Sequence, residues 1–181
     1  MRETTPSDVI ALWRDAGPRK WFGGGAVFDA QIRERFGEAH QIAARGELAD
    51  WENTADGALA LLLLTDQFPR NLYRHSAHAF ATDEMARGIA DRALVRGFDA
   101  QTDADLRAFF YLPFEHHEDA GSQARAVALF EKLGDKQGLD YAKLHADLIG
   151  RFGRFPHRNA VMGRISTPEE SAYLAQGGFA G

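Results

Sequence analysis

Apolar residues recur three and four positions apart along almost the whole chain of 181 residues. No stretch alternates apolar and β-branched residues with polar ones in the way that a half-buried strand does. Residues that start and stop helices bound these segments, as at Thr5, Thr54, Gly46 and Gly97. The sequence therefore predicts an all-α fold, with about seven or eight helices and no β-sheet.

Two prolines mark places where helices should end. The stretch ALALLLL at 58–64 is apolar on all sides, which favours a helix at the centre of the fold. Pro69 disfavours helical geometry at Phe68, so this helix should end in the segment DQFPRN. Pro113 lies inside FFYLPFEHHED and should kink or break a helix there. The segments SQARAVALFEKLGD and LDYAKLHADLIGRF have a short connection and should form antiparallel neighbours.

The length and composition are those of a globular protein with one core. Hydrophobic residues make up 45% of the 181 residues and charged residues 26%, so we expect a single domain over residues 1–181. The start MRETTPSDVI has no apolar signal core, and the run at 58–64 is too short to span a bilayer. A cytoplasmic location without a membrane partner is the expectation.

The charge and the absence of cysteine narrow the classes of partner and cofactor. A net charge of −5 argues against a nucleic-acid partner, which requires a basic surface. Without cysteine, any metal site would need histidine and carboxylate ligands. Such a set could combine three histidines with one acid, but it would have to converge from separate segments: His116, His145, His157, and Glu118 or Asp119. We therefore expect no metal and no other cofactor, and the sequence does not indicate an oligomeric state.

The segment RFGRFPHRN at 151–159 concentrates positive charge in an acidic protein. Gly153 and Pro156 should end a helix and fix a turn that presents Arg154, His157, Arg158 and Asn159. Guanidinium groups beside an imidazole suit a carboxylate or a phosphate. An equally open alternative is a buried ion-pair network that holds helices together. Its acids would be Asp66, Glu118 or Asp119.

The segment FEHHED at 114–119 is a second candidate for chemistry. On a helix, His116 and Asp119 lie three positions apart on one face and could present an imidazole with a carboxylate. Solvent exposure at a helix end accounts more simply for Glu115. His145 falls in a mostly apolar stripe, which favours a buried histidine with its hydrogen bonds satisfied.

The chain resembles the DUF924 family of uncharacterised bacterial proteins. The resemblance is carried in order by the motifs WFGGGAVFDAQIRERF, LLLLTDQFPRNLYR, AFATDEMA, FFYLPFEHHED, LHADLIGRFGRFPHRN and GRISTPEESAYL. It implies a tetratricopeptide-like superhelical array of paired antiparallel helices and no established activity. It also implies a set of signature positions gathered on the concave face: Asp66, Gln67, Arg70, Asn71, His145, Arg151, Arg154, His157, Arg158 and Asn159.

Two functions remain as expectations. The first is a pocket for a small phosphate or carboxylate between the FPRN and FPHRN turns, which would suit a hydrolase or a lyase. Arginines would hold the anion and asparagines would orient it: Arg70, Arg154 and Arg158, with Asn71 and Asn159. His116 and Glu118 would be its catalytic proton-transfer pair. The second is a protein-interaction module that binds an acidic peptide or a C-terminal carboxylate. Folding alone could also account for every motif.

Overall fold

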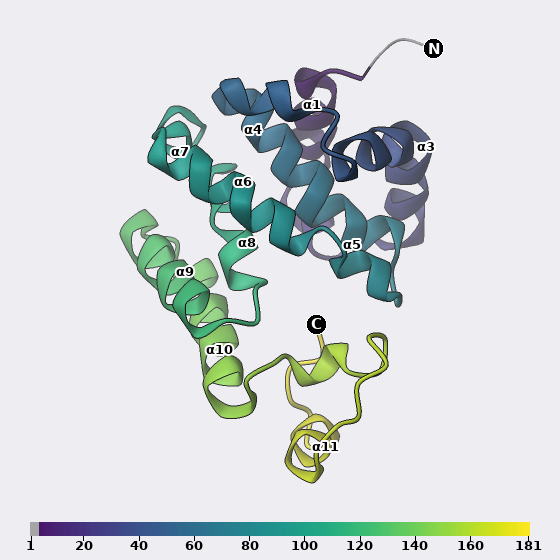
Figure 1. Cartoon of the computed structure of the whole chain (residues 1–181), viewed down its shortest axis with the longest axis vertical. Helices are drawn as coiled ribbons and strands as arrows, with labels where there is room; N and C mark the ends of the chain where they lie inside the picture. Colours follow the sequence, from purple (N-terminus) through teal and green to yellow (C-terminus); the bar gives the residue numbers. More distant parts are fainter. Residues whose placement is uncertain (1–3) are drawn as a thin grey trace. The chain divides into compact units, whose positions relative to one another are not determined.

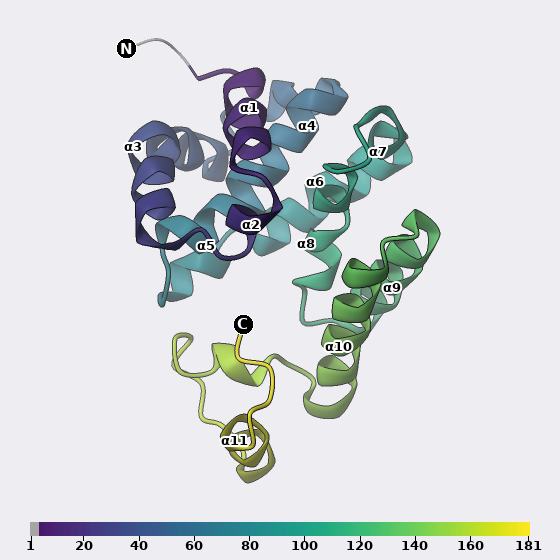
Figure 2. The same cartoon turned by 180° about the vertical axis from the view of Figure 1, so that it is seen from behind.

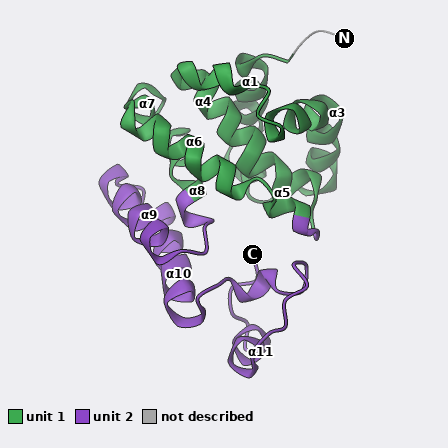
Figure 3. Cartoon of the chain, in the orientation of Figure 1, with its two compact units in different colours: residues 1–74, 78–113 green, residues 75–77, 114–181 purple. Residues whose placement is uncertain are grey.

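The computed structural model describes residues 4–181, which divide into two compact units (Figure 3). Unit 1 contains the chain up to Arg74 together with His78–Pro113, and unit 2 contains His75–Ala77 with Phe114–Gly181. Every regular element within residues 4–181 is helical, so the predicted all-α fold without a sheet is confirmed. The tetratricopeptide-like superhelix stays a prediction. The segment MRETTPSDVI was expected to contain no export signal. Residues 1–3 of this segment lie outside the described residues.

Unit 1 is organised around a central apolar helix, α4 (Figures 1 and 2). All residues of 58–64 are buried, as predicted, and α1 and α6 both pack against α4. The helices of unit 1 are α1, Pro6–Ala16; α2, Pro18–Trp21; α3, Gly25–Ala44; α4, Ala55–Leu62; α5, Phe68–Leu72; α6, Asp83–Val95; and α7, Phe98–Gln101. Shorter 3-10 helices cover Ala49–Asn53, Ala77–Phe80 and Arg107–Phe110, and a π-helix, η2, covers Leu63–Gln67.

The expected helix ends are present at several positions. Thr5 begins α1 with a reciprocal cap: its hydroxyl accepts from the N–H of Asp8 at 3.3 Å, and the Asp8 carboxylate accepts from the N–H of Thr5 at 3.0 Å. Thr54 caps α4 by accepting from the N–H of Gly57 at 3.1 Å. Gly97 follows α6 with a φ of 67°, a left-handed conformation that glycine adopts without strain.

The predicted helix end at Phe68 is wrong. Phe68 has φ −61° and ψ −35°, and the chain continues through η2 into α5. In η2 the N–H of Phe68 donates to the carbonyl of Leu63, five residues earlier, so this turn is wider than an α-helical turn. A proline ring clashes with the carbonyl four residues before it in a regular helix. The wider turn next to Pro69 explains how the helix passes the proline.

Side chains supply hydrogen bonds that the backbone around η2 does not make. Pro69 has no N–H to offer the carbonyl of Thr65, which accepts instead from the hydroxyl of Thr82. The carbonyl of Leu64 is bonded by Nδ1 of the buried His40 at 2.8 Å. Since buried carbonyls require partners, these two side chains stabilise the continuous path from η2 to α5.

We expect His40→Leu to lower the free energy of unfolding by about 1–3 kcal/mol, because it leaves the Leu64 carbonyl buried without that donor. His40→Asn keeps an N–H donor close to the position of Nδ1 and should lose less stability, although asparagine is the smaller side chain. Urea denaturation at neutral pH measures both variants. If His40→Asn loses more stability than His40→Leu, the effect comes from the smaller volume of the side chain and not from the hydrogen bond.

Unit 2 consists of two long helices followed by the basic turn and a short helix. Its elements are α9, Ala120–Leu133; α10, Lys136–Phe152; a 3-10 turn, Pro156–Arg158; and α11, Pro168–Ala175. The helices α9 and α10 pack side by side, as predicted (Figure 1). A core cluster of Leu148, Ile149 and Phe155 lies beneath Phe152, Tyr173 and Phe179.

The break predicted at Pro113 is confirmed. The short helix α8, Leu112–Glu115, contains this proline, and a new helix begins only at Ala120. Gln123 of α9 covers the break, because its side-chain amide donates to the carbonyls of Glu115 and His117 at 2.7 Å each. The backbone that leads from α8 to α9 is therefore held in place by a buried side chain.

Candidate functional site

The predicted site residues fall into two groups, one in each unit. Unit 1 holds Asp66, Gln67, Arg70 and Asn71. Unit 2 holds the proposed proton-transfer pair and the remaining signature positions: His116, Glu118, His145, Arg151, Arg154, His157, Arg158 and Asn159. The geometry of each group shows which of these side chains are engaged by other protein groups.

In unit 1, Arg70 lies between two carboxylates. Its Nη1 and Nη2 donate to the two carboxylate oxygens of Asp83 at 2.9 and 3.0 Å, and its Nη1 lies 3.4 Å from Oδ1 of Asp66. Gln67 donates to the other carboxylate oxygen of Asp66. Asp66 and Gln67 are both buried. Arg70 thus links η2 and α5 to Asp83 at the start of α6.

Asn71 belongs to a second network in unit 1. Its amide donates to Asp29 of α3 at 2.8 Å, and Arg74 donates twice to the same carboxylate, both at 2.8 Å. Burial alone would raise the pKa of Asp29, but the hydrogen bonds from Arg74 and Asn71 hold it below its usual value. The carboxylate is therefore ionised, and this network connects the end of α5 to α3.

In unit 2, acids outside RFGRFPHRN neutralise two of its arginines. Arg154 donates from Nε and Nη2 to the carboxylate of Glu170 at 2.6 and 2.8 Å. Arg151 contacts Asp147 on the exposed side of α10 at 3.3 Å. The positive charge that the sequence concentrates in this segment is therefore neutralised at these two residues. Arg154 therefore stabilises the turn by an ion pair with α11. The ion-pair alternative expected such a pair, but with Asp66, Glu118 or Asp119 as the acid.

Glu118, proposed as one half of the proton-transfer pair, is held as a carboxylate. Arg164 donates to both of its oxygens at 2.6 and 2.9 Å, and the N–H of Phe155 donates at 2.7 Å. Burial would raise the pKa of Glu118, but these hydrogen bonds lower it. A carboxylate with a lowered pKa is a poor proton donor at neutral pH, so Glu118 is better suited to holding Arg164 and the turn.

Asn159 is almost completely buried beneath this turn, at 1% exposure. Its amide nitrogen donates to the hydroxyl of Ser166 and to the carboxylate of Glu170, each at 3.1 Å. Its side-chain oxygen is buried without a hydrogen-bond partner among the described residues. Glu170 therefore binds Arg154 and Asn159 together and is the main acid of the turn.

His145 has the geometry of an oriented imidazole. Its Nδ1 lies 2.9 Å from the carbonyl of Tyr141 and 3.2 Å from Oε1 of Glu115. Both atoms are acceptors, so the proton of the neutral ring is on Nδ1 and the lone pair is on Nε2. Within residues 4–181, Nε2 of His145 forms no hydrogen bond. This leaves one nitrogen able to accept a proton.

His157 lies next to His145 in an aromatic cluster. Phe155 lies 5.2 Å from His145 and 5.6 Å from His157 between ring centroids, and Phe179 contacts both imidazoles as well. The Nδ1 atom of His157 is buried and has no hydrogen-bond partner in the described part of the chain. The two imidazoles therefore share one set of aromatic neighbours.

The surroundings keep both imidazoles neutral. Burial, followed by the charges of nearby groups that include Arg158, lowers the pKa of His145 to about 4 and that of His157 to about 4. His116 is close enough to lower both pKa values further. For His157, Glu118 acts in the opposite direction but does not reverse the effect. Glu115 thus lies 3.2 Å from Nδ1 of a neutral ring, whose hydrogen bond is made to the carbonyl of Tyr141.

Three residues that matter in unit 2 were not among the predicted site residues. Glu115 was assigned to an exposed helix end, but it is 3% exposed and orients His145. Glu170 was not singled out from the motif GRISTPEESAYL, although it is the N3 residue of the capping box begun by Thr167. That spacing shows that its side chain turns back toward the preceding loop. Phe179 follows the end of α11 and carried no signal.

No group of three or more His, Asp or Glu side chains within residues 4–181 has the arrangement of a metal site. The scattered set of histidines and acids considered from the sequence is not such a group. None of the helices in the same residues combines the length and the apolar character needed to cross a bilayer.

Comparisons with known proteins agree with the resemblance seen in the motifs. The family model described as "Bacterial protein of unknown function (DUF924)" matches residues 9–178. A solved structure of the protein ATU0120 from Agrobacterium tumefaciens, itself described as of unknown function, is 50% identical in sequence and superimposes with a TM-score of 0.92. The match covers 94% of this chain and 97% of that one. No curated protein matches the chain.

Proposed function

The chain belongs to the DUF924 family of bacterial proteins, and we propose that its unit 2 binds a small anion, a carboxylate or a phosphate, beside the imidazoles of His145 and His157. This places the anion in unit 2 and removes Arg154 from direct ligand binding, because Glu170 already engages its guanidinium. His145 takes over the proton-transfer role first assigned to His116 and Glu118.

One observation carries the proposal: the fixed proton on Nδ1 of His145 and the open lone pair on its Nε2. A buried carboxyl group that holds one nitrogen of a histidine fixes the tautomer and the orientation of the ring. Glu115 at 3.2 Å and the carbonyl of Tyr141 at 2.9 Å do this for His145. A purely structural histidine gains nothing from an open Nε2, whereas a proton acceptor requires it.

The sign of the surrounding charge supports an anionic ligand. Arg158 lowers the pKa of both imidazoles, and Arg164 also lowers that of His157. These guanidinium groups contribute positive potential at the two rings. A positive potential inside a protein raises the affinity for an anion.

Proton transfer follows from these two properties. An anion near the rings opposes the positive potential and raises the pKa of both imidazoles. The lone pair on Nε2 of His145 can then accept a proton from the ligand or from water and later return it. This chemistry would serve a hydrolase or a lyase that acts on a carboxylated or phosphorylated metabolite, the class expected from the sequence.

The test is calorimetric titration with inorganic phosphate and with acetate between pH 7.5 and pH 5, against chloride at equal ionic strength. Because binding raises the pKa of His145 and His157 from about 4, the protein should take up protons on binding. The affinity should then increase by about three- to tenfold for each pH unit over this range. Titrations in buffers with different ionisation enthalpies measure the proton uptake directly.

His145→Asn is the diagnostic variant, since asparagine keeps a donor near the position of Nδ1 and has no basic nitrogen. It should retain the fold and lose about half of the proton uptake, because His157 still titrates. His75→Asn is its matched control, because His75 is exposed and its φ of 64° suits asparagine. If neither anion binds the parent protein, the proposal fails. If His145→Asn binds with unchanged proton uptake, the anion lies elsewhere.

A peptide-binding module is a second candidate, favoured by two exposed apolar side chains beside the basic turn. Ile165 is 90% exposed and Met162 is 41% exposed. Arg154 donates to the backbone carbonyl of Ile165 at 2.9 Å, so positive charge lies next to this apolar surface. An acidic peptide that binds more tightly than acetate, and less tightly to Ile165→Ser, would favour this function over a metabolite site.

A further inference from the structure

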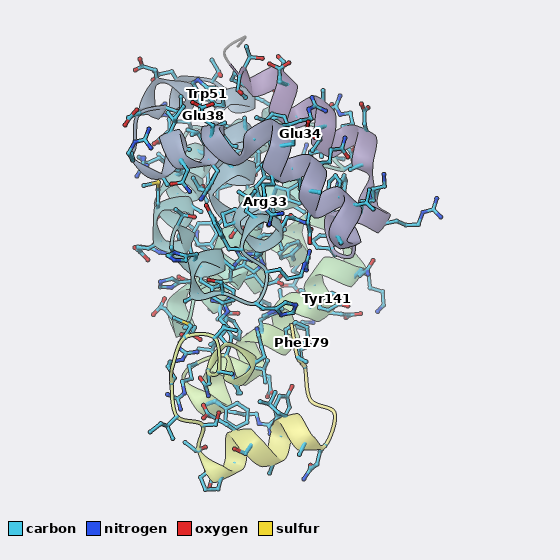
Figure 4. All side chains as sticks on the ribbon, turned by 90° about the vertical axis from the view of Figure 1, so that its right-hand side faces the viewer. Arg33, Glu34, Glu38, Trp51, Tyr141 and Phe179 are labelled. Atoms are coloured by element: carbon cyan, nitrogen blue, oxygen red, sulfur yellow. The ribbon has the colours of Figure 1, made fainter. Side chains whose placement is uncertain are left out.

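The ring of Phe179 occupies the space beside both imidazoles of unit 2. Its centroid lies 4.9 Å from that of His145 and 5.2 Å from that of His157, in edge-to-face contacts. Tyr141 of α10 is a further neighbour at 6.4 Å, and Figure 4 shows both side chains in this region. Phe179 is only partly buried. It therefore covers the histidines from the side that faces solvent.

The segment 177–181 that carries this ring is held by few polar contacts. The N–H of Phe179 donates to the hydroxyl of Tyr173 at 2.8 Å, and the N–H of Gly178 donates to the carbonyl of Tyr173 at 3.0 Å. Gly181 lies against His157, since a Cβ placed on it would be 3.2 Å from Cδ2 of that ring. The N–H of Gly177 donates to the carbonyl of Leu174 at 3.2 Å, so one ring and three backbone N–H hydrogen bonds attach the segment to unit 2.

We propose that Phe179 stands in for an apolar group of the ligand, so that unit 2 takes an anion that bears an aromatic or branched aliphatic group, which enters by displacing residues 177–181. This inference rests on the proposed function and specifies its ligand class. The apolar group would replace the Phe179 ring against Phe155 and the two imidazoles. The anionic group would lie where the backbone of Gly181 now contacts His157.

The selectivity follows from the exchange of one ring for another. A ligand that displaces Phe179 exposes its apolar ring to water, which is unfavourable. A ligand with its own ring buries a similar apolar area in the same place and restores the edge-to-face contacts. Acetate and inorganic phosphate cannot provide this compensation. The site should therefore favour the larger anions, although the charge they present is the same.

The experiment compares phenylacetate with acetate by calorimetric titration at pH 6. Phenylacetate should bind the parent protein roughly tenfold more tightly, because its ring replaces that of Phe179. In Phe179→Ala the ligand no longer competes with a resident ring, so phenylacetate should bind roughly tenfold more tightly again. Acetate should gain by the same factor, because displacing Phe179 costs the same whichever anion binds, so phenylacetate should keep its roughly tenfold advantage. Circular dichroism confirms that the variant is folded.

Tyr173→Phe is a milder variant that keeps the aromatic ring and removes only the hydroxyl that accepts from Phe179. It should loosen the segment and tighten phenylacetate binding by about threefold. Tyr73→Phe in unit 1 is its matched control, since the hydroxyl of Tyr73 accepts from Gln41 and has no role in unit 2. Only the first substitution should change the affinity.

A ligand-free measurement separates this inference from the proposed function. In Tyr173→Phe and Phe179→Ala, His145 should react faster with diethyl pyrocarbonate, and its pKa by NMR should rise because its ring is less buried. Unchanged reactivity, together with equal affinity for acetate and phenylacetate, would overturn the inference. If acetate and phosphate still bind with proton uptake, the proposed function survives that result. If no anion binds the parent or the variants, both fail.

Discussion

Glu170→Gln should lower the free energy of unfolding by about 2–3 kcal/mol, because it removes the carboxylate that binds both Arg154 and Asn159 of the basic turn. The Glu170 carboxylate accepts from Arg154, from Asn159 and from the N–H of Thr167 at 2.7 Å. Hydrogen bonds led by those of Arg154 lower the pKa of Glu170 to about 2. The side chain of Glu170 is 2% exposed, whereas that of Arg154 is 28% exposed and can be rehydrated. The expected loss is therefore below that of a fully buried pair.

Glu169→Gln is the matched control, since it removes the same charge from the same helix turn at an exposed position. It should cost less than about 1 kcal/mol, the value of an acid near a helix N-terminus. Urea denaturation at pH 7.5 measures both variants. Equal losses of stability in Glu170→Gln and Glu169→Gln would show that the hydrogen bonds of Glu170 add nothing to the effect of one negative charge near the helix N-terminus. The result also decides whether Arg154 belongs to the turn or to a ligand site.

The second large effect is a loss of stability between pH 7.5 and pH 5. The pKa values of His145 and His157 are about 4 in the folded protein, below the value of about 6.5 for an unfolded chain. As the pH falls through 6.5, the unfolded state binds protons that the folded state does not. The stability from each neutral imidazole is thus complete above pH 6.5 and is lost progressively down to pH 4. Each of the two histidines should lower the free energy of unfolding by about 2 kcal/mol between pH 7.5 and pH 5.

Urea denaturation at intervals of half a pH unit measures this slope. His145→Asn should reduce the loss by about half, because only His157 of the pair still titrates. His40, whose pKa is also lowered by burial, adds to the loss in the same direction. Acids with lowered pKa values, such as Glu118, change the stability only at pH values near or below the ordinary pKa of a carboxyl group. The loss of stability above pH 5 therefore comes from the histidines. A flat profile there would show that the imidazoles are as hydrated as in the unfolded chain.

Local signals account for the part of the fold that was predicted correctly. Thr5 and Thr54 act as helix caps because their hydroxyls accept from backbone N–H groups only three residues away. Such contacts are readable from short spacing alone. The burial of residues 58–64 was also predicted correctly from a local pattern, since a helix that is apolar on all sides has no polar face to expose to solvent.

The errors came from partners distant in the sequence. The sequence rule at Pro69 describes an isolated helix, whereas in the fold Thr82 and His40 bond the carbonyls at η2. In the sequence, RFGRFPHRN is a concentration of positive charge with no acid of its own. In the fold, Glu170 of α11 neutralises Arg154. Spacing places residues on one helix face, but it does not show which other helix packs there.

The same limit applies to the candidate site. His145 was expected to be buried, and it is, but its orientation depends on Glu115, the last residue of the short helix α8 that contains Pro113. A glutamate followed by two histidines resembles an ordinary exposed helix end. Its burial and its contact with His145 of α10, thirty residues later, appear only in the folded chain. Phe179 was unpredictable for a related reason, since a phenylalanine after two glycines has no periodicity to assign it to a face.

The π-helix η2 also sets the direction in which the following side chains point. One additional residue in a helical turn rotates everything after it by about 100° around the helix axis. With this rotation, Arg70 meets Asp83 and the next residue, Asn71, meets Asp29. Removing a single residue from Leu63–Gln67 would leave the composition of α5 unchanged and turn both side chains away from their acids. The arrangement of the FPRN motif is thus a matter of helical phase, established before the motif begins.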